Sequence, residues 1–278
     1  MQINGHTELI AHIGYPTHTF KSPMIYNPYF AQAGINAAVV PMGCKPDDYP
    51  AFLRAVFTLT NIRGALITMP HKVATVGLLD EVTPTVLVAG ACNAVKRTAD
   101  GRLQGDMFDG AGFVRGVQRK GVALRGARVL VVGSGGVGCA IAASLAGQGI
   151  GAISLFDVNA ASAQQLGARL KQHYPAIEVQ TGSNDPAGFD LVVNATPMGM
   201  NDGDPLPVDV LRLQASTFVG EVVMKTETTA FLKAAAQRGC RTQVGSDMLF
   251  EQIPAYLEFF GLPTTTAENL REVARISY

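Results

Sequence analysis

A glycine-rich segment near the middle of the chain constrains the fold more than any other feature. It begins with the short apolar stretch 128–132 (RVLVV), which is typical of a strand buried on both faces. The turn 133–138 (GSGGVG) follows, and the small residues of 139–146 then predict a helix. A second apolar stretch, 152–156, ends at Asp157. This order predicts a strand, a helix and a second strand parallel to the first.

A GxGxxG turn in this context is typical of a dinucleotide-binding site. Gly133 permits the tight turn, Gly135 lets the backbone approach a pyrophosphate, and Gly138 lets the helix pack close to the sheet. The N-terminus of that helix offers N–H groups and a partial positive charge to the phosphates. Asp157 lies where a carboxylate accepts from the ribose hydroxyls, and the next two residues include no Arg or Lys for a 2′-phosphate, so we expect NAD in preference to NADP. The alternative is a glycine-rich turn in which Asp157 only caps the following helix.

The balance of charge limits the partners of the chain. Its 278 residues include 22 Lys and Arg and 22 Asp and Glu, so no basic or acidic excess indicates a nucleic-acid or membrane partner. We find no apolar stretch typical of a secretion signal and no apolar run as long as a membrane span, so we expect a cytoplasmic protein. At this length two domains of ordinary size are expected.

The cysteines and histidines do not indicate a metal site. Cys44, Cys92, Cys139 and Cys240 are scattered, without the close spacing of a metal centre or a redox motif. We therefore expect reduced, mostly buried thiols. The five histidines form no pair at helical spacing, so no metal is predicted.

Strands and helices are expected to alternate before the glycine-rich segment. The stretches 9–14, 37–42 and 64–68 are apolar, as strands are, and helical patterns separate them. The turn signal 99–101 (ADG) predicts a hairpin. This order indicates a first α/β domain, distinct from the nucleotide-binding segment.

Seven short motifs lie along the chain in order. They are Lys21-Ser22-Pro23 with Asn27, 68–72 (TMPHK), 90–93 (GACN), 109–113 (DGAGF), 133–136 (GSGG), 194–200 (NATPMGM), and Met248-Leu249 with Gln252. Together they resemble the motifs of the shikimate dehydrogenase family, and the match runs nearly from end to end. Such an ordered set is far more specific than the glycine-rich turn alone.

The resemblance implies an α/β protein of two domains. Residues 1–112 would form an N-terminal α/β domain that binds the substrate and holds the catalytic residues. Residues 113–244 would form a Rossmann-type, doubly wound NAD-binding domain, and the C-terminal helices, 245–278, would pack back onto the first domain. The substrate would lie in the cleft between the two domains.

The expected chemistry needs a base beside the reacting hydroxyl. Hydride transfer from a secondary alcohol to a nicotinamide requires that the hydroxyl proton be removed, and a lysine can accept it if burial lowers its pKa. The resemblance assigns this role to Lys72, with Asp109 as its catalytic partner. Without the resemblance, Lys72 would be interpreted as a solvated helix residue and Asp109 as the cap of the next helix.

The resemblance also assigns the binding residues. Four polar residues would contact the substrate: Ser22, Thr68, Asn93 and Gln252. Around the cofactor it puts Gly133, Ser134, Gly135, Gly136, Val137, Asp157, Asn159, Asn194, Thr196, Pro197, Met198, Met200, Val222 and Gly245. Taken alone, a residue such as Asn93 would be expected only to satisfy buried backbone groups.

Four predicted substrate positions are apolar where the family is usually polar. They are Phe20 in place of Ser, Leu66 in place of Asn, Phe108 in place of Thr and Met224 in place of Tyr. In the family the paired serines and this tyrosine bind the ring carboxylate, so we expect weak use of shikimate and a related cyclic polyol as the substrate. The alternative is that these apolar residues pack against one another while other groups bind the same carboxylate.

The residues that follow the second strand of the nucleotide segment also depart from the family. Members that use NADP usually carry Asn-Arg-Thr where this chain has Asp157-Val158-Asn159. The lost arginine and the gained carboxylate both favour NAD over NADP.

These features together predict an NAD-dependent oxidoreductase. It would move hydride reversibly between NAD and a ring hydroxyl of shikimate or a related cyclic polyol. One alternative is a quinate dehydrogenase, and an alternative from another class is a non-catalytic NAD-binding sensor, which would not need the pair Lys72 and Asp109. The expected partner is this small molecule, with the protein a monomer or a homodimer.

Overall fold

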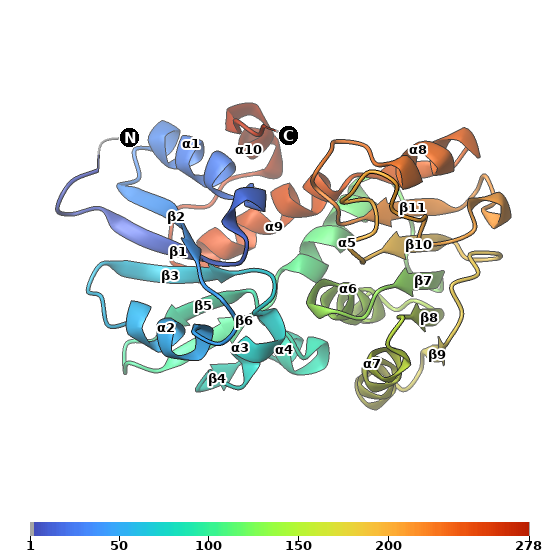
Figure 1. Ribbon diagram of the computed structural model, residues 1–278, viewed down its shortest axis with the longest axis horizontal. Coiled ribbons are helices and arrows are strands. Elements are labelled where there is room, and N and C mark those ends of the chain that lie inside the picture. The colour runs from blue at the N-terminus through green and yellow to red at the C-terminus, as the bar shows by residue number, and fades with distance from the viewer. Residues whose placement is uncertain (1–2, 278) are drawn as a thin grey trace. The chain divides into compact units, whose positions relative to one another are not determined.

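Two sheets organise the chain, one in each of two units (Figure 1). The computed structural model describes residues 3–277. The N-terminal unit consists of residues 3–108 and 252–277, and the C-terminal unit consists of residues 109–251. The predicted assignment of a substrate domain and a nucleotide domain, with boundaries at residues 112 and 244, stays a prediction.

The sheet of the N-terminal unit has the strand order β2-β1-β3-β5-β6-β4. Its strands are β1 (Glu8–Gly14), β2 (Ala37–Gly43), β3 (Ile62–Ile67), β4 (Glu81–Val82), β5 (Ala94–Arg97) and β6 (Leu103–Asp106). β1 runs parallel to β2 and β3, whereas β5 is antiparallel to both β3 and β6. The turn predicted at 99–101 therefore joins a hairpin. Ile10, Ala11 and Ile13 are fully buried, as expected for a strand covered on both faces.

Helices cover this sheet. They are α1 (Pro23–Ala33), α2 (Tyr49–Val56), α3 (Lys72–Val76), α4 (Pro84–Ala89), α10 (Ala267–Val273) and the second half of α9 (Gly245–Phe259). α1 begins with Pro23 in its first turn, where the missing N–H of proline costs no helical hydrogen bond. α10 lies beside α1 (Figure 1), and Asn269 Nδ2 donates to Gln32 Oε1 at 3.2 Å.

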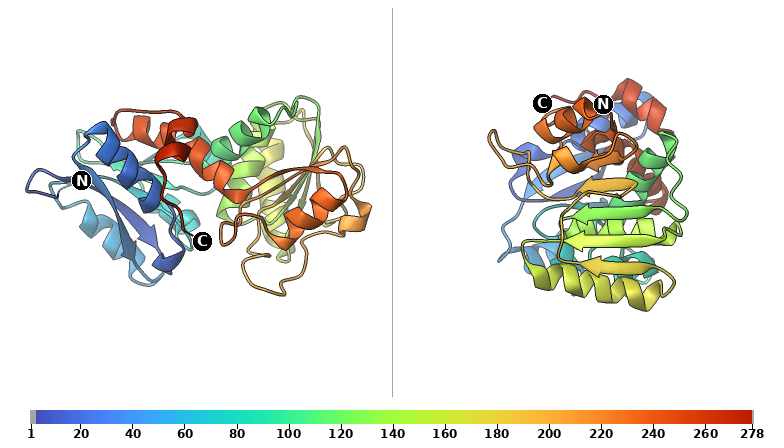
Figure 2. Two further views of the ribbon diagram at one scale, coloured as in Figure 1. Left: turned by 90° about the horizontal axis from the view of Figure 1, so that it is seen from above. Right: turned by 90° about the vertical axis from the view of Figure 1, so that its right-hand side faces the viewer.

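The sheet of the C-terminal unit has the strand order β12-β11-β10-β7-β8-β9. Its strands are β7 (Arg128–Val132), β8 (Ala152–Phe156), β9 (Glu178–Thr181), β10 (Leu191–Asn194), β11 (Phe218–Glu221) and β12 (Arg241–Gln243). Neighbouring strands are parallel, and Figure 2 (right) shows them side by side with one direction. The helices are α5 (Asp109–Arg119), α6 (Gly136–Gly147), α7 (Ala160–His173), α8 (Ala230–Gln237) and the first half of α9.

The strand order of the C-terminal unit reverses beside β7. The chain moves outward through β8 and β9, and then continues on the other side through β10, β11 and β12. This is the doubly wound arrangement of a Rossmann-type domain, so the predicted fold class is confirmed. Ligands of such sheets bind at the carboxyl ends of the strands where the order reverses, which here is between β7 and β10.

Three further observations concern the described chain, residues 3–277. The four cysteines are buried and form no disulfide there. No helix of this part is long and apolar enough to cross a membrane. No group of three or more His, Cys, Asp or Glu side chains in it is arranged to hold a metal ion.

Candidate active site

The glycine-rich turn between β7 and α6 leaves room for a ligand. Gly133 has a φ of +105°, which favours glycine, and a Cβ at Gly138 would lie 2.0 Å from Gly133 O. A Cβ at Gly135 would instead meet nothing within 4 Å. The hydroxyl of Ser134 is buried and has no hydrogen-bond partner among the described residues. The turn therefore fits the pyrophosphate of a dinucleotide at the N-terminus of α6, where Gly136 and Val137 form the first helical positions.

Asp157 follows β8 and fastens the glycine-rich turn. Its Oδ2 accepts from the N–H of Ser134 at 2.6 Å, and its Oδ1 accepts from the N–H of Asn159 at 2.8 Å. Asn159 is the residue that caps α7, because its Oδ1 accepts from the N–H of Ala161. The alternative role of Asp157 as the cap of that helix is therefore wrong.

The motif after β10 forms a closed set of hydrogen bonds. Asn194 Nδ2 donates to Met198 O at 3.0 Å, and Asn194 Oδ1 accepts from the N–H and the hydroxyl of Thr196 at 3.1 and 2.6 Å. The hydroxyl of Thr196 accepts in turn from the N–H of Met198. Pro197 is exposed and Met200 is half-buried. The motif is thus held by its own polar groups, while these two side chains stay accessible.

The predicted cofactor residues gather at the carboxyl ends of neighbouring strands. The glycine-rich turn adjoins the motif after β10, since a Cβ at Gly133 would lie 2.7 Å from Ala195 O. Val222, which follows β11, donates its N–H to Asn194 O at 3.2 Å. A Cβ at Gly245, which follows β12, would lie 2.2 Å from a carbonyl of the segment after β11. These ends lie where sheets of this kind bind dinucleotides.

Glu221, the last residue of β11, is a buried acid that the sequence analysis missed. Its Oε2 accepts from Thr229 Oγ1 at 2.9 Å, and burial raises the pKa of its carboxyl to about 7. Met224, predicted to face the substrate, is half-buried in the segment between these two residues. The available signal was an acid at the end of the apolar stretch 218–221.

Lys72 lies at the start of α3 in the N-terminal unit and is 9% exposed. The ring of the preceding residue, His71, stacks on Tyr49 at 3.9 Å, and its Nε2 lies 2.8 Å from Cys44 O. The hydroxyl of Thr75 donates to His71 O at 2.8 Å and lies 2.6 Å from the hydroxyl of Tyr49. Because these four contacts hold the start of α3, the position of the Lys72 backbone is fixed.

Asn93 joins three parts of the same unit. Its Oδ1 accepts from the N–H of Phe108 at 2.9 Å, while its main-chain oxygen accepts from the N–H of Ile67 at 2.8 Å and from the hydroxyl of Tyr256 at 3.2 Å. Asn93 Nδ2 is buried and has no partner among the described residues, and the same is true of Gln252 Oε1, one turn before Tyr256 on α9. Buried polar atoms of this kind cost free energy unless a ligand or water bonds them. They mark a candidate substrate site.

Several predicted substrate residues lie around His12 of β1. His12 is the register partner of Leu66 on β3, so both side chains lie on one face of the sheet. The ring of Phe20 stacks on the imidazole of His12 at 4.1 Å. Burial and, to a lesser degree, the charge of Lys72 lower the pKa of His12 to about 3. His12 was not predicted as a site residue; its signal was an imidazole within an otherwise apolar strand.

The end of β1 brings Thr68 to the same place. A Cβ at Gly14 would lie 2.4 Å from Thr68 Cγ2 and 3.0 Å from the ring of Phe20. Ser22 is buried just before α1, and its side chain makes no capping hydrogen bond. Phe20, Leu66, Thr68 and Lys72 are therefore neighbours within one unit.

Phe108 and Asp109, also predicted for the site, are not found among the residues around His12. Phe108 packs in an aromatic cluster, with ring centroids 4.8 Å from Tyr256 and 5.7 Å from Phe259. Asp109 begins α5 of the C-terminal unit and is 3% exposed. Because Asp109 and Lys72 belong to different units, their catalytic pairing stays a prediction.

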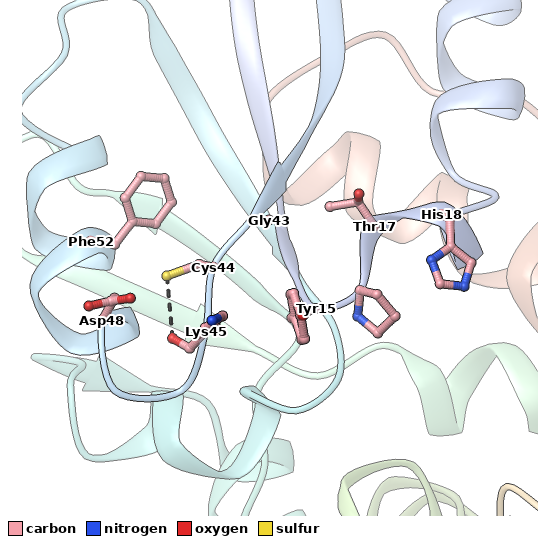
Figure 3. A pocket seen from close by; sticks show the side chains of 9 residues that line it. Tyr15, Thr17, His18, Gly43, Cys44, Lys45, Asp48 and Phe52 are labelled. Atoms are coloured by element: carbon pink, nitrogen blue, oxygen red, sulfur yellow. Dashed lines mark hydrogen bonds between the residues drawn. The ribbon is translucent and has the colours of Figure 1, made fainter.

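A pocket of about 560 Å³ opens at the carboxyl ends of β1 and β2 (Figure 3). It is lined by Tyr15, Pro16, Thr17, His18, Gly43, Cys44, Lys45, Asp48 and Phe52. The thiol of Cys44 donates to the main-chain oxygen of Lys45 at 3.5 Å. None of the predicted substrate residues lines this pocket, so we assign it no part in the reaction.

Known proteins resemble this chain over almost its whole length. The family model for the shikimate dehydrogenase substrate binding domain matches residues 12–95, and that of the ThiF family matches residues 114–171. The shikimate dehydrogenase (NADP(+)) of Rubrobacter xylanophilus is 34% identical over 255 residues, 90% of this chain and 89% of that protein. The quinate dehydrogenase of Corynebacterium glutamicum, solved in complex with NAD, is 30% identical, with a TM-score of 0.84 over 96% of this chain and 98% of that one. The 5-ketofructose reductase of Gluconobacter sp. strain CHM43 is 26% identical, with a TM-score of 0.85 over 97% and 98%.

The predicted preference for NAD over NADP is wrong. Five curated relatives, between 31% and 34% identical, are named shikimate dehydrogenase (NADP(+)). The prediction treated Asp157 as a free carboxylate, but each of its oxygens accepts a main-chain N–H in the structure. Two such donors compensate part of the negative charge, so the carboxylate alone does not exclude a 2′-phosphate.

The relatives reported above are enzymes, which decides against the non-catalytic sensor. Identity of a third over nine-tenths of the chain is found together with a fold that solved dehydrogenases share. Membership of one enzyme family also accounts for the ordered motifs and for the predicted cofactor residues at the carboxyl ends of neighbouring strands. This chain belongs to the shikimate dehydrogenase family and is an oxidoreductase.

Proposed function

We propose that this enzyme transfers hydride reversibly between NADP and a ring hydroxyl of a cyclic polyol related to shikimate. The supporting observation is a pair of buried polar atoms without a partner among the described residues, Asn93 Nδ2 and Gln252 Oε1. Cys92, the neighbour of Asn93, donates its N–H to Lys72 O at 2.8 Å, so the main chain at the start of α3 lies next to the segment that carries Asn93. A ring with several hydroxyls offers donors and acceptors to both atoms.

Lys72 is the proposed base. In oxidation its neutral Nζ accepts the proton of the substrate hydroxyl while hydride leaves the carbon that bears this hydroxyl. In reduction Nζ returns the proton to the oxygen. Asp109 is proposed to orient the lysine and stabilise its charged form. Asn93 and Gln252 bond neighbouring hydroxyls and so orient the ring. NADP, when bound, takes up or gives back the hydride.

NADP is proposed because the curated relatives are named for it. The open space at Gly135 and the buried hydroxyl of Ser134 fit its pyrophosphate. The two N–H donors on Asp157 reduce the repulsion that a 2′-phosphate would meet there.

Shikimate itself is proposed to be a poor substrate. Where the family presents hydroxyl and amide groups, this chain has Phe20, which stacks on His12, and Leu66, the register partner of His12. Each hydrogen bond lost to a charged group costs about 1.5–3 kcal/mol, or roughly ten- to a hundredfold in kcat/KM. The Gluconobacter neighbour is named for 5-ketofructose, a substrate without a carboxylate, which supports a change at this end of the site.

Quinate is the second candidate substrate. The quinate dehydrogenase of Corynebacterium glutamicum is 30% identical to this chain. Quinate carries the same carboxylate as shikimate, so the apolar residues weigh against both acids. Only a direct comparison of the two separates these candidates.

Initial rates of cofactor reduction test the proposal. Purified enzyme is given shikimate or quinate, each with NADP and with NAD, beside the Rubrobacter xylanophilus relative as a reference. We expect turnover with NADP and a kcat/KM for shikimate at least roughly tenfold below the reference. Equal efficiency on shikimate would contradict the weak-substrate proposal, and faster turnover of quinate would favour the second candidate.

A further inference from the structure

His12 adjoins two of the predicted substrate residues and is influenced by the charge of Lys72, although the family resemblance assigns it no role. Phe20 stacks on its ring, Leu66 is its register partner, and the charge of Lys72 acts on it. The residue is 6% exposed, so little but a bound molecule can reach the imidazole.

One nitrogen of the His12 imidazole is available to a ligand. This Nδ1 is buried without a hydrogen-bond partner among the described residues. A buried polar atom left in this state destabilises the protein, whereas a ligand group that bonds it removes the cost. His12 shares this condition with Asn93 and Gln252, which are already proposed to bind the substrate.

The chemistry of the ring decides what it can bind. Burial keeps His12 uncharged at neutral pH because it lowers the pKa to about 3, so the ring has one donor and one acceptor nitrogen. Such a ring bonds a hydroxyl, a carbonyl or an amide, but it brings no positive charge to a carboxylate. The nearby cation of the loop, Lys21, donates to the main-chain oxygen of Ser277. A carboxylate that bonds the imidazole beside Phe20 would therefore lose its water without gaining a counter-charge from His12.

We propose that His12 is a substrate-binding residue that selects uncharged substrates. Its imidazole bonds a hydroxyl, carbonyl or amide group at the position where shikimate carries its carboxylate. This inference rests on the proposed function and narrows its substrate class to uncharged polyols and the matching ketones.

Shikimate and its carboxamide form a matched pair of probes, since they differ little in size but only the acid is charged. With NADP, we expect wild-type kcat/KM for the carboxamide to exceed that for shikimate by about tenfold or more. His12→Leu should raise the KM for the carboxamide by about tenfold with little change in kcat, and should affect shikimate less. His12→Gln should restore part of the loss. The exposed residue His6 gives the control, and His6→Leu should behave as wild type.

Binding measurements separate the failure of this inference from the failure of the proposed function. The imidazole ¹⁵N resonances of His12 should move when the carboxamide binds, and His12→Leu should weaken its binding. If this occurs without turnover of either compound, the inference stands and the proposed function is wrong. If turnover occurs while the resonances stay in place, or if shikimate is preferred to the carboxamide, the inference is wrong. Absence of both binding and turnover would overturn both.

Discussion

Glu221 Oε2 accepts a hydrogen bond from Thr229 Oγ1 at 2.9 Å, and both residues are buried. Thr229 also caps α8 by accepting from the N–H of Leu232, so the bond ties the end of β11 to the next helix. Glu221 Oε1 has no partner among the described residues. Burial raises the pKa of this carboxyl from 4.5 to about 7. Between these two pH values the carboxyl is protonated in the folded protein and ionised in the unfolded chain.

We expect this carboxyl to make stability fall as the pH rises from about 4.5 to about 7. Across that range the folded state binds more protons than the unfolded state, so each rise in pH favours unfolding. The group contributes a loss of up to about 3 kcal/mol in the free energy of unfolding. Glu221→Gln imitates the protonated form, so it should flatten this slope and be more stable than wild type above pH 7.

Urea unfolding between pH 4.5 and pH 8 measures this effect. Glu227 is an exposed carboxylate in the segment between β11 and α8, and Glu227→Gln should keep the wild-type slope. Parallel curves for wild type and Glu221→Gln would show that the buried carboxyl does not titrate in this range.

Gly138 and Gly135 should respond differently to alanine. The Cβ of Gly138→Ala would lie 2.0 Å from Gly133 O, so the backbone must move and stability should fall by about 2 kcal/mol or more. The Cβ of Gly135→Ala meets nothing within 4 Å at a φ of −74°, so stability should change by less than about 0.5 kcal/mol. That Cβ would nevertheless stand where the pyrophosphate is proposed to approach, and we expect the Kd for NADP to rise at least roughly tenfold. Urea unfolding and calorimetric titration separate the two effects, and unchanged NADP affinity in Gly135→Ala would contradict the proposed phosphate position.

The sequence predicted those parts of the fold whose cause is local. The stretches 128–132 and 152–156 are β7 and β8, because a short run of aliphatic residues between turn signals favours a strand buried on both faces. The turn at 99–101 joins β5 and β6, because its residues suit a tight turn. Gly138 was predicted to allow close packing of the helix on the sheet. A Cβ at this position would lie 2.0 Å from Gly133 O, so there is no room for a side chain.

The parts that failed depend on contacts between distant segments. Asp157 was expected to select NAD, but the availability of its charge depends on where the N–H of Ser134 comes to lie. His12 lies in an apolar strand, where nothing beside it in the sequence indicates a role. Its stacking on Phe20 and its register with Leu66 become apparent only in the folded chain. The raised pKa of Glu221 likewise depends on burial that cannot be predicted from the residues next to it in the sequence.

Lys72→Ala should abolish turnover and spare NADP binding. Loss of a positioned base costs roughly 10²–10⁴ in rate. Because the charge of Lys72 helps to lower the pKa of His12, the variant should also raise that pKa, while burial still holds it below the ordinary value. Rates at saturating substrate, NADP titration and an NMR pH titration of His12 check the three effects. Lys45 is exposed in the same unit, and Lys45→Ala should keep wild-type rates. Wild-type activity in Lys72→Ala would remove this residue from the mechanism.

Phe20→Ser combined with Leu66→Asn restores the polar groups that the family usually carries. If apolar side chains are what weakens the use of shikimate, the double variant should raise kcat/KM for shikimate at least roughly tenfold, because a carboxylate regains two neutral donors. Phe52→Ser is the matched control, since it removes another half-buried ring of the same unit, one that lines the unassigned pocket, and should gain no activity. Comparison of the two variants separates a regained contact from a loosened fold, since both lose aromatic packing and only one regains donors. No gain in the double variant would mean that other groups already bind the carboxylate, and that the apolar residues around His12 pack the site without choosing its substrate.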